Sequence, residues 1–308
     1  MDRGMHKLLI VTQPTRLEEL RRQFNTTAQA KFYVECLGAD FDDYIREDEA
    51  YRRSLEQTRA AAERFARVQT VPRGYLPNLI LGERDTVIAL GRDGLVANVM
   101  KYLHGQPLIG VNPDPARWDG RLLPFRPGEL ERLLPEVLAR RRPEEAVTMA
   151  RAETRDGQVL YAANDFFLGI RDHRSARYEI EYRGRREKQC SSGVIVSTGL
   201  GMTGWHASVM AQLQAMAKAQ GLGTLRQPAL RRSDRRLRFC VREPYPSRTT
   251  GTGIVCGELG PEEELVLRSD MARDGILFSD GIQEDAIAFA SGMEVRISVA
   301  KRQGRLVV

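Results

Sequence analysis

The stretch Asp-Thr-Val-Ile-Ala-Leu-Gly-Arg-Asp-Gly, residues 85–94, decides how the first half of this chain folds. Its apolar run predicts a buried strand over 85–90. Gly91 and Gly94 then bracket a tight turn, and a helix is expected to start there. Its apolar face is formed by Leu95, Val96, Val99, Met100 and Leu103. A strand that passes through a glycine turn into a helix is typical of a parallel α/β sheet.

Neighbouring segments extend this sheet. Residues 7–12 and 107–111 are further apolar runs that predict buried strands. Thr15 with Glu18 forms a capping-box pattern at the start of a helix over 17–24. Residues 41–67 carry apolar positions at helical spacing and predict one long amphipathic helix or two. Strand, helix and strand in this order indicate a parallel sheet.

The second half of the chain has a different character. Residues 136–146 indicate a helix end and a domain boundary, and one helix is expected over 203–219. The remaining signals are short β-rich runs, at 158–162, 166–170, 177–182, 193–198, 236–241, 253–256, 263–268 and 294–299. We therefore expect an α/β domain over 1–145 and a β-rich, β-sandwich-like domain over 146–290. A C-terminal segment, 291–308, is expected to return to the first domain.

Composition narrows the class of protein. The chain has 308 residues, 42% hydrophobic and 29% charged, without an apolar run long enough to span a membrane. The short run Leu8–Val11 is too brief for a signal peptide. Four cysteines lack C-x-x-C spacing and four histidines are scattered, which argues against a zinc site. We expect a cytoplasmic protein with reduced thiols.

The net charge of +6 comes mostly from arginine. A basic surplus can serve acidic ligands, nucleic acid or solubility. The clusters at 140–142 and 231–238 lack the interleaved aromatic residues of a single-strand binding groove. A nucleic-acid partner is therefore not expected; a steep salt dependence of DNA binding would be its sign.

Two glycine turns could hold a phosphate or a ribose. In the turn at 91–94, Asp93 would repel an anion but could bind or deprotonate a sugar hydroxyl; it could also simply cap the helix. The turn at 199–204 reads G-x-G-x-x-G, yet no acidic residue stands between Trp205 and Ser233. A dinucleotide-binding dehydrogenase therefore fits poorly. His206 is interpreted as a helix-surface histidine, and Met202, Met210 and Met216 as packing residues.

Taken together, these motifs resemble the NAD kinase family. Residues 91–94 resemble its G-G-D-G loop, 197–205 is similar to its second loop, T-P-T-G-S-T-A-Y, and 163–165 stands where the family has an Asn-Glu pair. The mitochondrial-type branch is the nearer match, through residues 12–16, 110–115, 187–193, 238–244 and Trp205. The resemblance runs from about residue 7 to about residue 290.

The resemblance implies an α/β domain followed by a β-rich domain, and transfer of the ATP γ-phosphate to the 2′-hydroxyl of NAD or NADH. Asp93 would assist the attacking hydroxyl, while Asn164 and Asp165 would hold the adenosine half of NAD. Thr203, Gly204 and Ser208 would line the nicotinamide-ribose side. The other positions expected at the nucleotide site are Gly91, Arg92, Gly94, Asn112, Thr198 and Gly201. Mg²⁺ would be bound mainly by ATP phosphates rather than by protein ligands, and the family forms homodimers or larger assemblies.

The departures from the family pattern lie on the phosphate-donor side. Arg92 replaces the second glycine of G-G-D-G, and Leu95 replaces the following threonine. Arg92 could bind phosphate itself or fill the ATP site. Asp165 replaces glutamate, and Gly199, Leu200 and Met202 replace residues of the second loop. The alternative function is therefore a family relative with an altered donor site, acting as a dinucleotide sensor or on another acceptor.

Overall fold

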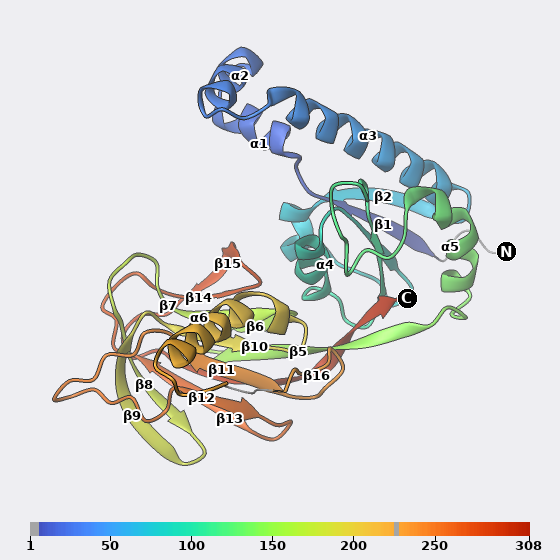
Figure 1. Ribbon diagram of the computed structural model, residues 1–308. Coiled ribbons are helices and arrows are strands. Elements are labelled where there is room, and N and C mark those ends of the chain that lie inside the picture. Colours follow the sequence, from blue (N-terminus) through green and yellow to red (C-terminus); the bar gives the residue numbers. More distant parts are fainter. Residues whose placement is uncertain (1–5, 225–227) are drawn as a thin grey trace. The chain divides into compact units, whose positions relative to one another are not determined.

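The computed structural model describes residues 6–224 and 228–308, which divide into two compact units. The first unit holds the chain up to Glu145 together with Arg305–Val308, and the second holds Ala146–Gly304. Figure 1 shows a helix-rich first unit and a β-rich second unit. The predicted fold class, α/β followed by a β-rich part, is confirmed. Among the described residues, no helix combines the length and the apolar character needed to cross a lipid bilayer.

The first unit is built on a parallel sheet in the order β2-β1-β3-β4. These strands are β1 (Lys7–Thr12), β2 (Arg67–Pro72), β3 (Thr86–Leu90) and β4 (Pro107–Val111). Every residue of β3 and β4 is buried, because helices cover both faces of the sheet. The end of β16 (Glu294–Val307) adds a further parallel strand beside β4, through Arg305 and Leu306.

The α-helices described in this unit are α1 (Arg16–Gln23), α2 (Thr27–Cys36), α3 (Phe41–Glu63), α4 (Asp93–Met100) and α5 (Leu130–Leu138). The capping box predicted at Thr15 and Glu18 is present at the start of α1. Residues 41–63 form one long helix, which packs with α5 on one face of the sheet; α4 lies against β3 and β4. The short helix α2 and strand β2 were not predicted.

The second unit contains a six-stranded antiparallel sheet in the order β12-β11-β10-β7-β14-β15. Its strands are β7 (Asp165–Ile170), β10 (Val194–Ser197), β11 (Leu237–Val241), β12 (Cys256–Leu259), β14 (Gly275–Ser279) and β15 (Ile282–Ala288). The expected strand at 253–256 starts three residues later than predicted, at Cys256. Helix α6 (Trp205–Ala219), the one α-helix among the described residues of this unit, covers one face of the sheet through Trp205 and Val209.

The other face of this sheet packs on further strands of the second unit. They are β5 (Glu144–Thr154), β6 (Val159–Ala162), β8 (Ala176–Tyr182), β9 (Arg185–Ser191), β13 (Glu264–Ser269) and the first part of β16. The large apolar cluster between the two layers includes Phe166, Tyr178, Phe239 and Ile297. A sandwich of this kind exposes polypeptide turns at its ends, and these turns carry the second set of predicted site residues.

Candidate functional site

Asp93 is fixed at the carboxyl end of β3. Arg92 is the N-cap of α4 and Asp93 is its first helical residue, so the alternative that Asp93 caps this helix is wrong. The Asp93 carboxylate instead accepts hydrogen bonds from the backbone N–H of Leu122, at 2.7 Å, and of Arg121, at 3.3 Å. Each oxygen receives one bond, so the half-buried carboxylate is held in place and keeps lone pairs for a ligand.

The two glycines of this turn have different roles. A Cβ on Gly91 would meet the Leu95 side chain at 2.9 Å and Gln13 at 3.0 Å, so glycine is needed there for packing. A Cβ on Gly94 would meet nothing within 4 Å, and Gly94 is exposed. Leu95 is 1% exposed and is therefore part of the core. Of these three positions, Gly94 alone leaves open space for a ligand.

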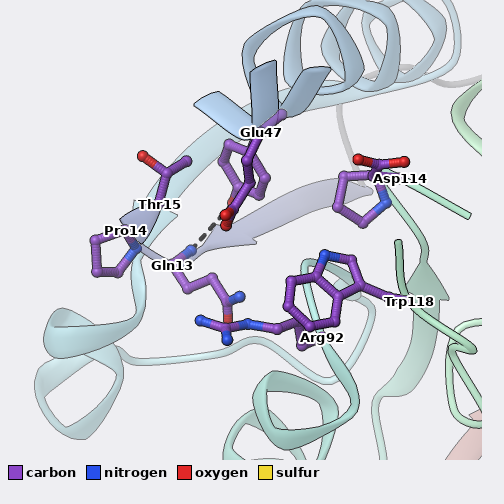
Figure 2. A pocket seen from close by; sticks show the side chains of 9 residues that line it. Gln13, Pro14, Thr15, Glu47, Arg92, Asp114 and Trp118 are labelled. Atoms are coloured by element: carbon purple, nitrogen blue, oxygen red, sulfur yellow. Dashed lines mark hydrogen bonds between the residues drawn. The ribbon is translucent and has the colours of Figure 1, made fainter. Parts of the chain in front are cut away.

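A small pocket lies beside this turn, at the carboxyl ends of β1, β3 and β4. In Figure 2 the Arg92 side chain extends toward Gln13 and lies next to Trp118. The Arg92 guanidinium is 5.1 Å from the centre of the Trp118 ring, and no described carboxylate forms an ion pair with it. The pocket is lined by Gln13, Pro14, Thr15, Glu47, Tyr51, Arg92, Pro113, Asp114 and Trp118.

The two carboxylates of this pocket are already paired. Glu47 binds Arg16 and Asp114 lies 3.3 Å from Arg117, so neither neutralises Arg92. An arginine that is oriented by an aromatic ring and lacks a carboxylate partner is suited to bind an anion. The sequence singled out Arg92 but gave no sign of Trp118 as its support.

Asn112 is buried and its amide is used within its own loop. The side-chain Nδ2 donates to the Trp118 carbonyl at 2.9 Å, and Oδ1 accepts the N–H of Asp114 at 3.1 Å. Gly110 supports the same region, because a Cβ there would lie 1.9 Å from the Leu122 carbonyl oxygen. Asn112 therefore shapes the loop that carries Trp118. Its role as a nucleotide ligand stays a prediction.

In the second unit, the structure brings Asn164, Asp165, Thr198 and Gly201 together. The Thr198 hydroxyl donates to the Ala163 carbonyl and accepts the N–H groups of Leu200 and Gly201, at 3.1 and 3.3 Å. A Cβ on Gly201 would lie 2.2 Å from the Asn164 carbonyl oxygen. The glycine turn thus packs directly on the segment 163–165. The Asn164 side chain is half-buried and bonds to no described residue.

Asp280, which sequence reasoning missed, anchors this segment. Its Oδ1 accepts the N–H groups of Asn164, at 2.7 Å, and Asp165, at 3.1 Å, and its Oδ2 accepts that of Ala163, at 3.0 Å. Asp280 and Gly281 form the turn between β14 and β15, both with positive φ. An Asp-Gly pair between two apolar runs is a hairpin signal that would have located the turn.

Asp165 has an unusual environment. It is 7% exposed, and no described residue donates a hydrogen bond to its carboxylate. Burial, and secondly the charge of Asp280, raise the pKa of Asp165 to about 7. Asp165 therefore exchanges a proton near neutral pH. Beside it on β10, the buried Ser197 hydroxyl also has no hydrogen-bond partner among the described residues.

These two residues belong to a polar row that crosses the six-stranded sheet. Asp165, Ser197, Arg238 and Glu258 are direct neighbours on β7, β10, β11 and β12. Arg238 is 6% exposed and donates to Glu258 at 3.1 Å. His206 at the start of α6 is 4% exposed, and burial and then the charge of Arg238 lower its pKa. The interpretation of His206 as a surface residue is therefore wrong.

The start of α6 also carries the exposed positions of the predicted site. Thr203, Gly204 and Ser208 are exposed, and the hydroxyls of Thr203 and Ser208 bond to no described residue. Trp205 stacks on Phe167, with ring centres 5.2 Å apart. Of the three methionines interpreted as packing residues, Met202 and Met210 are half-buried, but Met216 is 59% exposed and does not fit that interpretation.

The described residues include no group of three His, Cys, Asp or Glu side chains that could hold a metal ion. Asp93 is a single carboxylate that keeps free lone pairs. One carboxylate is too few to hold a metal ion by itself, so a Mg²⁺ ion here would be bound mainly by phosphate oxygens and water.

Comparisons with known proteins give a structural likeness without a sequence match. No protein-family model and no curated protein sequence matches the chain. The crystal structure of an NAD kinase from Archaeoglobus fulgidus in complex with ATP matches with a TM-score of 0.56 and 16% identity, over 99% of this chain and 94% of that one. The yeast NADH kinase complexed with NADH matches with a TM-score of 0.58 and 16% identity, over 98% and 83%. This chain has the fold of those kinases.

Proposed function

We propose that this protein is an ATP-dependent NAD or NADH kinase. The observation that carries the proposal is the tethered carboxylate of Asp93, which stands at the carboxyl end of β3, where open α/β sheets bind ligands. The structural likeness to an NAD kinase and to an NADH kinase supports the same chemistry. The reaction joins the acceptor 2′-oxygen to the γ-phosphorus of ATP, breaks the bond to the β-phosphate oxygen and releases ADP.

In this proposal each residue acts by positioning or by charge, as is usual in phosphoryl transfer. Asp93 accepts a hydrogen bond from the 2′-hydroxyl and takes its proton as the hydroxyl attacks. Its two backbone hydrogen bonds keep the carboxylate from turning away. Mg²⁺, bound mainly by ATP phosphates, would neutralise charge on the donor.

The second unit is proposed to recognise the dinucleotide. Asn164 and Asp165 hold the adenosine half, since among the described residues nothing bonds to the Asn164 amide and nothing donates to the buried Asp165 carboxyl. The exposed hydroxyls of Thr203 and Ser208 are available to the nicotinamide ribose. Thr198, Gly201 and Asp280 shape these segments through the backbone. Location in the cytoplasm, a homodimer and the mitochondrial-type branch stay predictions.

A second candidate function rests on Arg92 and Leu95. Because Leu95 is buried and Arg92 extends into the pocket beside the turn, the donor side differs in chemistry from a glycine-rich phosphate loop. A protein that binds NAD without phosphorylating it, as a sensor, would tolerate this change. So would an enzyme that acts on another acceptor.

The test is incubation of the purified protein with NAD, ATP and Mg²⁺, with NADP detected by a coupled dehydrogenase and NAD binding followed by calorimetry. Formation of NADP that is lost in Asp93→Asn would support the kinase. Tight binding of the dinucleotide without its phosphorylation, found with NAD and again with NADH, would favour the sensor. Binding of neither dinucleotide would refute the kinase and the sensor, and would leave an enzyme that acts on another acceptor.

A further inference from the structure

Two cysteines face each other across the edge of the six-stranded sheet. Cys240 on β11 and Cys256 on β12 are direct neighbours in the antiparallel register. Next to them, the Val241 N–H donates to the Val255 carbonyl at 2.7 Å. Cys240 and Cys256 therefore form a non-hydrogen-bonded pair, in which the two Cα atoms approach to about 4.5 Å and the side chains lie on one face. Disulfides need Cα atoms about 4.4–6.8 Å apart, so this pair meets the requirement.

The two thiols differ in access. Both are free. Cys256 is exposed on β12, the edge strand of the sheet, where it can meet a reagent from solution. Cys240 is 5% exposed and packs with Phe167 and Ile195. Burial, and secondly the neighbouring Cys256, raise the pKa of the Cys240 thiol to about 12. An exposed thiol beside a buried one forms an attacking and resolving pair.

We propose that Cys240 and Cys256 form a reversible intramolecular disulfide when the protein meets a low-molecular-weight disulfide. The Cys256 thiolate attacks one sulfur of the reagent, forms a mixed disulfide and releases the first small thiolate. Cys240 then attacks the Cys256 sulfur, gives its proton to the departing thiolate and closes the Sγ–Sγ bond. Two protein thiols are oxidised and one small disulfide is reduced to two thiols, so atoms and electrons balance.

Geometry favours the second step although the Cys240 thiolate is scarce. The strand pairing holds the Cys256 sulfur next to Cys240. The two sulfurs therefore meet by rotation of the cysteine side chains about χ1, without a diffusional encounter. Cys36 offers the contrast. It is exposed on α2, and no cysteine faces it in the described structure. The same reagent should leave Cys36 as a mixed disulfide. This inference is independent of the proposed nucleotide chemistry.

The experiment treats the full chain with oxidised glutathione, followed by trypsin digestion without reduction and mass spectrometry. Trypsin releases Cys240 in residues 239–242 and Cys256 in residues 249–268. We expect these two peptides joined by a disulfide, with a mass lower by two hydrogen atoms than the sum of the reduced peptides. The link should disappear on adding a reductant.

Two variants serve as controls. Cys256→Ser alters an exposed edge position, so it should fold as the wild type and lose the link. Cys36→Ser should keep it. A stable glutathione adduct on Cys256, with 239–242 recovered as a free thiol peptide, would overturn the proposal. A disulfide between Cys240 and another cysteine in the Cys256→Ser variant would also overturn it.

Discussion

The substitution Asp280→Asn tests whether this carboxylate holds the segment that carries Asn164 and Asp165. The change keeps the shape of the side chain, and Asn tolerates the φ of 53° at this turn position. The carboxylate accepts three backbone N–H groups, at 2.7, 3.0 and 3.1 Å. A hydrogen bond to a charged group contributes about 1.5–3 kcal/mol. The amide keeps one acceptor oxygen and turns its NH₂ group toward at least one N–H, so we expect the free energy of unfolding to fall by about 2–4 kcal/mol.

An opposing effect makes the loss depend on pH. The charge of Asp280 contributes to the raised pKa of Asp165, which is about 7. When Asp165 is ionised, removing the charge of Asp280 also removes a repulsion. The substitution should therefore cost more stability below pH 7, where Asp165 is protonated, than above it. It should also lower the pKa of Asp165 itself.

Urea unfolding and amide hydrogen exchange measure these effects. Asp274→Asn is the matched control, because Asp274 also has positive φ, of 63°, but among the described residues its exposed carboxylate binds Arg174 alone. An exposed ion pair contributes at most about 1 kcal/mol. The amides of residues 163–165 should exchange faster in Asp280→Asn alone. Equal losses in the two variants, with wild-type exchange at 163–165, would refute the anchoring role.

Three further substitutions address the chemistry. Asp93→Asn should lower kcat by about 100-fold or more, while the circular dichroism spectrum stays unchanged because asparagine keeps the shape of the side chain at the start of α4; wild-type turnover would remove Asp93 from the mechanism. Arg92→Gly should raise the KM for ATP by about tenfold or more through the loss of a charge-assisted contact, and a gain of activity would mean that Arg92 obstructs the donor. The pKa of Asp165 is raised to about 7 from 3.8, so its stabilising effect is complete below pH 3.8 and is lost as the pH rises through 7. Across that range the free energy of unfolding should fall by up to about 4 kcal/mol more in the wild type than in Asp165→Asn; equally steep profiles in the two proteins would contradict the assignment.

The sequence predicts those helices and strands whose apolar side chains are buried. The strands β1, β3 and β4 are apolar runs that stay buried, so periodicity found them. Strand β9 has the sequence Arg-Arg-Glu-Lys-Gln-Cys-Ser and pairs with β8 at seven positions. Its mostly polar sequence has no alternation of apolar and polar residues, so the sequence alone does not predict this strand. Helix α2 was missed because Phe32 and Tyr33 are exposed, which removes the usual contrast between a polar and an apolar face.

The candidate site was predictable as residue types and not as contacts. The turn at 91–94 locates Asp93 at the end of a strand, but its partner, Leu122, is 29 positions away. The contact between Asp280 and Asn164 spans 116 positions. His206 was misassigned for the same reason, since its burial and the charge of Arg238 on a distant strand, which together lower its pKa, both come from tertiary packing. Local sequence specifies turns and helix starts, while tertiary packing decides which polar groups meet.

Two glycines, one in each turn, differ in why glycine is present: Gly201 is required by packing, whereas Gly94 has open space beside it that a ligand could use. A Cβ on Gly201 would lie 2.2 Å from the Asn164 carbonyl oxygen, so Gly201→Ala must displace backbone and should destabilise the protein by about 1–3 kcal/mol. A Cβ on Gly94 meets nothing, and alanine is the better helix former at the start of α4, so Gly94→Ala should stabilise by up to about 1 kcal/mol. If Gly94 lets a nucleotide approach the backbone, the same variant should lose activity while it gains stability, as measured by thermal unfolding and turnover on one preparation. A more stable Gly94→Ala protein with full activity would show that no ligand contacts this turn at Gly94.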